Sequence, residues 1–359
     1  MYPFTNCVNC GPRYSVIENM PYDRKNTTMK NFLLCDKCNL EYLSIDKRRF
    51  YAQCISCSLC GPRHILYDNN QKKICDEKDT IKKVAELINN NFIIAIKSDG
   101  GFNLVCNASN DNVIKKLRFR LNRYMQPFAV LCDSINTMSN YCLITNKEKE
   151  LLSSKERPIV VCNKKISNKK KEEYNFLESI APGLHNIGLI LPYNGTHILL
   201  FHYLKKYNIH SLIDTSANIP GNPMIIDNNE AFEKLKDIAD FYLVHNRKIN
   251  NRIDDSVIRL VSKKPVFLRR SRGFVPNYIE IPFKNKKHII GLGAELNNTI
   301  ALLNENKVYL SQHIGNTKYI DTNEFHKNTI IKYSKLLGIK PEIYVIDLHP
   351  NFNTTHTGV

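Results

Sequence analysis

Several features that would define a familiar class of protein are missing from this sequence. No apolar run reaches the roughly 18 to 20 residues that a membrane-spanning helix needs, and Ile93–Ile96 has only the length of a buried strand. The first residues lack the basic and apolar regions of a signal peptide. Hydrophobic residues make up 43% of the chain, which excludes a disordered or collagen-like protein. We therefore expect a cytoplasmic protein with no membrane partner.

The common catalytic signatures are also missing. The sequence contains no Walker A loop, no HExxH and no GxSxG, so no single short motif identifies a reaction. The length of 359 residues is enough for two or three domains.

The charge is strongly one-sided, with a formal net charge of +17. Lysine and asparagine are frequent throughout, including residues 163–175, which we expect to form a charged surface loop. Much of the charge therefore reflects composition and solvated side chains. The remainder would attract phosphate-bearing ligands or RNA.

Cysteine is distributed unevenly, because eight of the 12 cysteines fall within the first 75 residues. Two CxxC pairs, Cys35/Cys38 and Cys57/Cys60, are separated by 18 residues. A CxxC turn places two sulfurs on one ion, and two such turns at this spacing are typical of a tetrahedral zinc site. Metal binding is favoured over disulfides in the cytosol. We predict that these four cysteines bind a structural Zn²⁺.

A repeat precedes this site. The pattern that runs from Cys7 through Cys10 to Gly-Pro-Arg recurs 50 residues later at Cys57. The first copy has no opening CxxC pair, so Cys7 and Cys10 are predicted to be half of a second metal site. The simplest explanation is that the chain starts inside the repeat of a longer protein. The remaining six cysteines are expected to be structural thiols, namely Cys54, Cys75, Cys106, Cys132, Cys142 and Cys162.

The middle of the chain alternates between apolar strand-like runs and helical patterns, which predicts a mixed α/β sheet domain. The expected strands are 92–96, 102–106, 128–131, 158–161, 187–191 and 212–214. The expected helices are 80–90, 110–121, 196–207 and 229–238. Residues 67–79 and the lysine-rich 281–287 are expected to be linkers. A further domain begins at 288, with strands 288–292 and 299–303, and is too short to close a core of its own.

A polar motif follows the strand that ends at Asp214. Thr215, Ser216 and Asn218 offer two hydroxyls and an amide at a strand end, where a phosphate or nucleotide fits. Such a motif also commonly only caps a helix.

Three further motifs are candidates for a site, and two of them have two interpretations each. The arginines Arg118, Arg120 and Arg123 form either a basic cluster entering a strand or a solvated helix face. In Arg269–Gly273, guanidinium groups are able to hold phosphate oxygens. Residues Asp254–Ser256 either bind metal or cap a helix, and capping is favoured.

The order of these motifs resembles the HypF family of carbamoyltransferases, which act in hydrogenase maturation. The resemblance rests on the CxxC-Gly-Pro-Arg fingers and on Lys97 before Gly100-Gly101-Phe102, followed by Pro127-Phe128-Ala129, Leu191-Pro192-Tyr193, Thr215–Asn218, His245-Asn246-Arg247, Asp254–Val257, Arg269–Gly273, Gly291–Leu296, Ser311–Gly315 and Asp347–Pro350. It covers essentially the whole chain. It implies zinc-ribbon-like fingers in 1–66 with the first one incomplete, a YrdC-like twisted-sheet domain in 80–284, and the beginning of an actin-like, TsaD-like α/β domain in 288–359.

The resemblance also implies a reaction. The YrdC-like domain would join carbamate, obtained from carbamoyl phosphate, to Mg²⁺-bound ATP, giving carbamoyl-adenylate and pyrophosphate. The TsaD-like domain would pass the carbamoyl group to the C-terminal cysteine of the partner protein HypE. The missing parts of a split HypF are a further implied partner.

Position by position, the resemblance assigns catalytic roles to Arg123 and Lys97. It assigns nucleotide binding to Thr215, Ser216, Asn218 and Arg269. The sequence departs from the family pattern where lysines are usual, at Leu121 and Gln126, and also at Ser98, Asn103, Asn194–Thr196, Asn297 and Asn316. With two phosphate-neutralising lysines replaced, we expect weakened adenylation.

Two other functions fit parts of the sequence. A threonylcarbamoyl-adenylate synthase-like enzyme of tRNA modification would share the YrdC-like core and show threonine-dependent exchange between ATP and pyrophosphate. An RNA-binding zinc protein without catalysis would use the positive charge and the fingers, since the YrdC-like fold is linked to double-stranded RNA. Its RNA binding would weaken steeply with salt.

Overall fold

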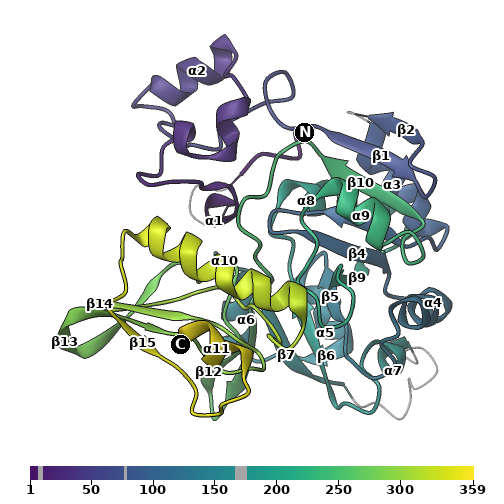
Figure 1. Ribbon diagram of the computed structural model, residues 1–359. Helices are drawn as coiled ribbons and strands as arrows, with labels where there is room; N and C mark the ends of the chain where they lie inside the picture. Colours follow the sequence, from purple (N-terminus) through teal and green to yellow (C-terminus); the bar gives the residue numbers. More distant parts are fainter. Residues whose placement is uncertain (7–10, 77–78, 166–175) are drawn as a thin grey trace.

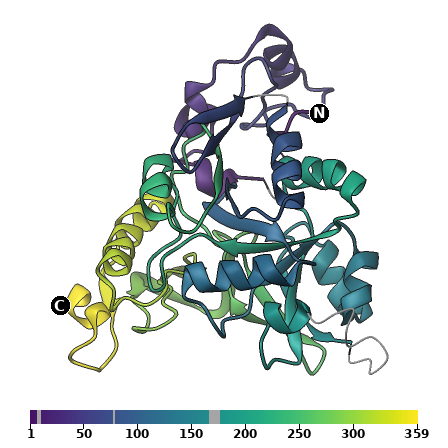
Figure 2. The same cartoon turned by 90° about the vertical axis from the view of Figure 1, so that its right-hand side faces the viewer.

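The structure is a computed structural model that describes residues 1–6, 11–76, 79–165 and 176–359. Figure 1 shows three regions: a small N-terminal region at the upper left, a large sheet with helices, and a C-terminal region at the lower left. In a view turned by 90°, the N-terminal and C-terminal regions lie at different edges of the sheet domain (Figure 2). None of the helices in the described ranges has the length and apolar character needed to cross a bilayer.

The N-terminal region has few regular elements, namely α1 (Arg13–Val16), α2 (Asp36–Leu43) and two short 3₁₀ turns. The Arg24 side chain holds its loops together. Its guanidinium donates hydrogen bonds to the carbonyls of Phe32, Gln53 and Ile55 at 2.6, 2.8 and 2.9 Å. Burial lowers the pKa of Arg24. These bonds replace the backbone ladders that so small a region lacks.

The large sheet has the strand order β12-β11-β7-β8-β5-β9-β4-β3-β10-β1-β2, with β6 paired to β7. Its strands are β1 (His64–Asp68), β2 (Lys73–Asp76), β3 (Ile94–Lys97), β4 (Phe102–Asn107), β5 (Ala129–Cys132), β6 (Cys142–Leu143), β7 (Ile159–Lys164), β8 (Asn186–Ile190), β9 (Ser211–Ser216), β10 (Phe241–His245), β11 (Val257–Val261) and β12 (Lys264–Arg269). Parallel and antiparallel pairs both occur, so the predicted mixed α/β sheet is confirmed.

Helices cover both faces of this sheet. Helices α3 (Thr80–Asn89) and α8 (Gly195–Leu204) pack on one face. The other face is covered by α4 (Asp111–Leu121), α5 (Ile135–Tyr141), α6 (Asn146–Ser153), α7 (Phe176–Ile180) and α9 (Asn228–Lys234). Along β3 the side chains alternate between the two cores, with Ile94 and Ile96 in one and Ala95 in the other.

The predicted helices and strands of this domain are confirmed, with shifts of a few residues at their ends. The helix predicted at 110–121 is α4, and the Asn110 side chain caps it by accepting from the backbone of Asn112 and Val113. The helix predicted at 229–238 ends earlier, at Lys234. Of the surface loop predicted at 163–175, Asn163 and Lys164 belong to β7, and residues 166–175 lie outside the described ranges.

Both segments expected as linkers contain strands, so these predictions are wrong. Within 67–79, strand β2 forms a hairpin with β1, and β1 pairs with β10. Residues 281–287 lie inside β13 (Tyr278–Gly291), which pairs with β14 (Ala301–Leu310). The outer part of that ribbon is exposed on both faces, so its lysines are solvated and its sequence lacks the apolar alternation of a half-buried strand. For this reason the sequence resembled that of a linker.

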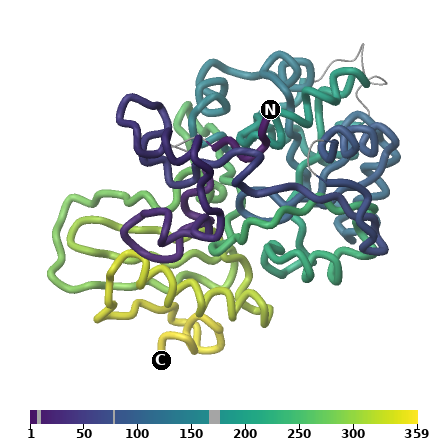
Figure 3. Tube along the Cα trace, turned by 90° about the horizontal axis from the view of Figure 1, so that it is seen from above, coloured from purple at the N-terminus to yellow at the C-terminus, as the bar shows by residue number. Residues whose placement is uncertain are grey.

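The C-terminal region contains a second sheet, in the order β14-β13-β15, where β15 is Ile343–Val345. Helices α10 (Ile320–Leu337) and α11 (Asn353–Gly358) accompany it. Its core includes Ile290, Leu302 and Tyr333, and is completed by Tyr14 and Ile253 from elsewhere in the chain. Figures 1 and 3 both show the N-terminal segment running beside the C-terminal region. The three regions therefore share a core.

Candidate functional site

The structure brings the four predicted zinc ligands together in the N-terminal region. The sulfurs of Cys35, Cys38, Cys57 and Cys60 all lie within 4.8 Å of one another. The Cys35–Cys57 sulfurs are 3.7 Å apart and the Cys57–Cys60 sulfurs 3.8 Å. A tetrahedral Zn²⁺ with Zn–S bonds of about 2.3 Å sets its sulfurs roughly 3.8 Å apart. The donor set and its spacing therefore fit zinc.

The other cysteines behave differently. Cys106, Cys132, Cys142 and Cys162 are buried, and burial raises the pKa of each thiol. The burial expected of structural thiols is thus confirmed for these four, while Cys54 and Cys75 are partly exposed. Cys7 and Cys10, predicted as half of a metal site, lie outside the described residues.

A second candidate site is a cavity of about 280 Å³ at the end of the sheet. Strand β9 delivers the predicted Thr215 and Ser216 to it. It is joined by a neighbouring cavity of about 270 Å³, which Arg123, Gln126, Ser216, Asp254 and Arg269 also line. Asn218 lines only the second cavity. The two cavities form one cleft between the sheet domain and the C-terminal region.

Arg123 organises the polar segment Thr215–Asn218, which comprises the last two residues of β9 and the two that follow it. Its Nη2 donates to the backbone carbonyl of Asn218 at 2.9 Å and to Asn218 Oδ1 at 2.8 Å. Its Nη1 donates to Thr215 Oγ1 at 3.4 Å. Ser216 Oγ donates to the same Asn218 oxygen at 3.0 Å. Four of the predicted site residues are thus held in one hydrogen-bonded group.

The arginines before β5 are not a solvated helix face. Arg118 is buried and donates to the carbonyls of Arg123 and Gln126 at 2.7 and 2.9 Å, which shapes the loop that presents Arg123. Arg120 pairs with Asp240 at 2.8 Å, away from the cleft. Burial, and then the charge of Arg269, lowers the pKa of Arg123. An anion between Arg123 and Arg269 would relieve both effects.

Arg269 and His313 share one carboxylate partner, Asp254. Its Nη1 lies 3.5 Å from Asp254 Oδ2, and His313 of the C-terminal region lies 3.3 Å from the same oxygen. Burial favours a raised pKa for Asp254, but the hydrogen bond from His313 and the charge of Arg269 outweigh it and lower the pKa. The favoured reading of Asp254–Ser256 as a helix cap is wrong, because the segment leads into strand β11.

Lys97, predicted as catalytic, does not line this cleft. Its Nζ donates to Asn228 Oδ1 at 2.8 Å and is 3.4 Å from the carbonyl of His245. Burial lowers its pKa to about 8. The sheet places Lys97 at the end of β3 but turns its side chain toward β10 and α9. The structure therefore separates it from the group around Arg123.

Leu121 and Gln126, which stand where the family usually has lysine, occupy different environments. Leu121 is buried in the core beneath α4, so its side chain does not reach the cleft. Gln126 lines both cavities. Compared with the family pattern, therefore, only Gln126 replaces a lysine at a position that would face a bound phosphate.

The floor of the cleft contains polar residues to which the sequence analysis assigned no site role. Asn103 Nδ2 donates to Asp214 Oδ1, and both are buried. Burial, and then the charge of Asp255, raises the pKa of Asp214 to about 7. Ser98 Oγ and the hydroxyl of Tyr193 lie 3.1 Å apart at the same end. The pairing of Asn103 with Asp214 depends on neighbouring strands β4 and β9, which no local pattern reveals.

Gly100 forms part of one wall of the cleft, where its backbone lies against the backbone of Ile253. A Cβ there would lie 2.1 Å from the carbonyl oxygen of Ile253, so only glycine fits. The contact places Asp254, the next residue, at the mouth of the cleft. Gly100 thus has a positioning role.

Three family models match the chain in succession. The HypF finger matches residues 1–17 and 34–67. The Sua5/YciO/YrdC model, described as telomere recombination, matches residues 86–271. The HypF Kae1-like domain matches residues 284–358. The expected order of fingers, YrdC-like domain and actin-like segment is confirmed.

Known relatives agree with this order. The chain is 43% identical to the probable carbamoyltransferase HypF of Methanocaldococcus jannaschii and 38% identical to the carbamoyltransferase HypF of Synechocystis sp., covering 99% and 98% of this chain and 45% of each relative. It superposes on T. kodakarensis HypF with a TM-score of 0.93 at 46% identity, covering 99% of this chain and 46% of that one. A full-length HypF in a phosphate- and nucleotide-bound form gives 0.91 at 37%, covering 99% of this chain and 45% of that one. The chain thus spans a little under half the length of these relatives.

Proposed function

Since this chain belongs to the Sua5/YciO/YrdC family and carries HypF finger and HypF Kae1-like segments on either side, we propose that it activates carbamate with ATP in a HypF-type reaction. The observation that carries the proposal is the cleft where Arg123 holds the Thr215–Asn218 loop opposite Arg269. The reaction joins a carbamate oxygen to the α-phosphorus of ATP and releases diphosphate.

The cleft residues take separate parts in this reaction. Arg123 and Arg269 would neutralise the phosphates, and Ser216 and Asn218 would orient them. Adenylation needs mainly positioning and charge neutralisation, which fixed guanidinium groups and hydroxyls supply. Magnesium would arrive with ATP. Lys97 enters this scheme as a buried residue behind the cleft rather than as a group that touches the nucleotide.

The nucleotide-bound form of full-length HypF, at 37% identity, supports the assignment of a nucleotide ligand. The carbamoyl group would then pass to the HypE C-terminal cysteine. This chain covers 45% of the length of the Methanocaldococcus jannaschii relative. We place the fingers in 1–66, the YrdC-like domain in 80–284 and the TsaD-like segment from 288. The reduced four-cysteine site, filled by structural Zn²⁺, fits a cytoplasmic protein.

The test is nucleotide binding followed by exchange. Titration calorimetry with Mg²⁺–ATP should show binding to the wild-type chain, and Arg123→Met should weaken it. Carbamate-dependent exchange of labelled diphosphate into ATP should then follow, with a full-length HypF as positive control. Binding that is unaffected by Arg123→Met would refute the site. Binding without exchange would refute the activity while leaving the nucleotide site in place.

A further inference from the structure

Asp214 lies at the floor of the candidate nucleotide cleft, on strand β9, and its side chain is only 1% exposed. Asn103 Nδ2 donates to one of its carboxylate oxygens, Oδ1. The other oxygen, Oδ2, has no hydrogen-bond partner among the described residues. Buried acceptors are almost always satisfied, and an unpaired buried charge is costly. Oδ2 is therefore the acceptor that this site leaves for a ligand.

His197 does not satisfy this oxygen. Its Nε2 lies 4.0 Å from Asp214 Oδ2, beyond hydrogen-bond distance. Burial lowers the pKa of His197 to about 4, so the ring is neutral at pH 7 and supplies no positive charge. Burial, and then the charge of Asp255, raises the pKa of Asp214 to about 7. A donor to Oδ2 would stabilise the ionised carboxylate and offset this cost.

The other two carboxylates that line this cavity within the described residues have arginine partners. Asp254 lies 3.5 Å from Arg269, and Asp255 accepts a hydrogen bond from Arg272 Nε at 2.5 Å. Asp214 has no lysine or arginine within ion-pair distance in the described part of the chain. Its unpaired oxygen thus sets it apart from its neighbours in the same cavity.

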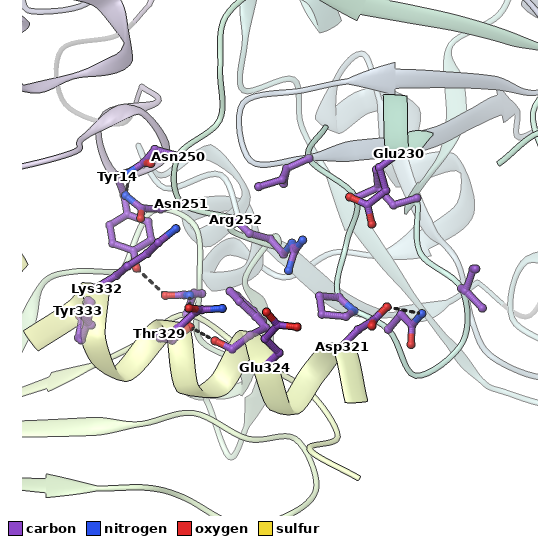
Figure 4. Close-up of a pocket in the computed structure, with 18 of the residues that line it drawn as sticks. Tyr14, Glu230, Asn250, Asn251, Arg252, Asp321, Glu324, Thr329, Lys332 and Tyr333 are labelled. Carbon is purple, nitrogen blue, oxygen red and sulfur yellow. Dashed lines mark hydrogen bonds between the residues drawn. The ribbon is translucent and has the colours of Figure 1, made fainter. Parts of the chain in front are cut away.

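A different cavity, of about 360 Å³, lies beside α10 and is shown in Figure 4. Two of the carboxylates in its wall, Glu230 and Asp321, pair with Lys234 at 3.0 and 3.4 Å. That wall therefore supplies a partner for these charges from the chain itself. The wall around Asp214 does not, which favours a ligand as the source of the missing donor.

The strand places Asp214 near the residues that would orient the phosphates. Successive side chains of a strand point to opposite faces, so Asp214 and Ser216 share one face of β9 and lie about 7 Å apart along it. Asn103 stands opposite Ser216 on the neighbouring strand β4 and reaches Asp214 diagonally. A small acyl group bonded to a phosphate at Ser216 would therefore extend toward Asp214.

Carbamate carries the donor that this position lacks. Its nitrogen has two N–H groups, whereas acetate has a methyl group in the same place and offers no donor there. An ionised carboxylate only accepts hydrogen bonds. A site built around such an acceptor rejects an analogue without the donor, because the buried acceptor then remains unpaired.

We propose that Asp214 determines the specificity of the cleft for the acyl group, because its Oδ2 accepts a hydrogen bond from the amino group of carbamate while Asn103 holds Oδ1. This inference rests on the proposed function, since it names the residue that distinguishes the substrate of that reaction. It assigns Asp214 no part in the bond that forms or breaks.

Titration calorimetry with two stable adenylate analogues tests the proposal. The compound 5′-O-(N-carbamoylsulfamoyl)adenosine ends in an amino group, and 5′-O-(N-acetylsulfamoyl)adenosine ends in a methyl group of similar size. The wild-type chain should bind the carbamoyl analogue at least about tenfold more tightly, as expected for one charge-assisted hydrogen bond. Equal affinities of the wild-type chain for the two analogues would overturn the proposal.

Two variants locate the preference. Asp214→Asn keeps the shape of the side chain but places a donor at the position of Oδ2, so the preference should fall to within about twofold while Mg²⁺–ATP binds as in wild type. Asp237→Asn changes an exposed carboxylate outside the cleft and should keep the wild-type preference. Asn103→Ala releases Oδ1 and should also reduce the preference. An unchanged preference in Asp214→Asn, or in Asn103→Ala if Asp214→Asn does not fold, would overturn the proposal.

The two analogues also separate this proposal from the proposed function. If the wild-type chain binds neither, the nucleotide site is refuted and this inference with it. If it binds both equally, the nucleotide site stands and only the role of Asp214 is refuted. If it prefers the carbamoyl analogue but catalyses no carbamate-dependent exchange, the proposed activity is refuted and the role of Asp214 in recognition stands.

Discussion

Asp254 Oδ2 accepts a hydrogen bond from His313 Nδ1 across 3.3 Å, although the two residues are 59 positions apart. The same oxygen lies 3.5 Å from Arg269. The C-terminal region, which lines part of the candidate nucleotide cleft, therefore also contacts the carboxylate that pairs with Arg269. This arrangement explains how a segment outside the sheet domain is able to influence a site within it.

The His313 contact predicts a measurable coupling. In His313→Ala, Arg269 keeps a partner that is less well fixed, so we expect the affinity for Mg²⁺–ATP to fall about threefold to tenfold. Calorimetry measures the change. His185→Ala removes an exposed histidine outside the cleft and serves as the control. Equal affinities for the two variants would show that His313 does not act on the site.

Arg123 is expected to be the most sensitive cleft residue. Arg123→Met removes the charge and three hydrogen bonds to the Thr215–Asn218 loop, so nucleotide affinity should fall by at least about tenfold. Arg120→Met, on the same stretch of chain but paired with Asp240 instead, should bind nucleotide as wild type. The opposite order of effects would contradict the assignment.

The two replaced lysine positions should respond in opposite ways. Gln126→Lys adds a cation that faces the cleft and should strengthen ATP binding severalfold. Leu121→Lys places a charge in the core and should lower the free energy of unfolding by about 3 kcal/mol or more. Denaturant unfolding and calorimetry measure these effects. A stable Leu121→Lys with improved ATP binding would show that position 121 reaches the cleft.

The four-cysteine cluster predicts a defined metal content. Cys57→Ser should lose the zinc bound at this site and destabilise the N-terminal region, because its fold depends on the metal and on Arg24. Cys75→Ser lies outside the cluster and should retain zinc. Elemental analysis by mass spectrometry gives the stoichiometry, and equal zinc in both variants would refute the site.

Lys97 predicts a specific dependence of stability on pH. Burial lowers its pKa from 10.5 to about 8 in the folded protein. Between these values the unfolded chain binds a proton that the folded chain does not, so this group makes stability rise with pH from 8 upward. In Lys97→Met this contribution is lost.

The effect is read as the difference between Lys97→Met and wild type in free energy of unfolding. The variant should gain stability relative to wild type at pH 7, and the gain should shrink by on the order of 2 kcal/mol by pH 10. Lys82→Met, an exposed lysine on α3, should show no such trend. A difference that stays constant with pH would contradict the lowered pKa.

Local patterns in the sequence determined much of this protein. The spacing of Cys35, Cys38, Cys57 and Cys60 was sufficient for the metal cluster, because each CxxC turn fixes two sulfurs within a few residues. The apolar periodicity likewise located the strands and helices of the sheet domain. The Thr215–Asn218 motif was found because it directly follows the buried part of strand β9, residues 211–214, and β9 itself continues to Ser216.

Only the tertiary structure decided which distant residues share a site. It turned Lys97 away from the cleft, buried Leu121, drew the segments expected as linkers into strands, and brought His313 to Asp254. Each outcome depends on which strands pair and which face a side chain takes. Strand pairing and side-chain orientation depend on the burial of apolar surface over the whole chain, so they cannot be predicted from a short stretch of sequence.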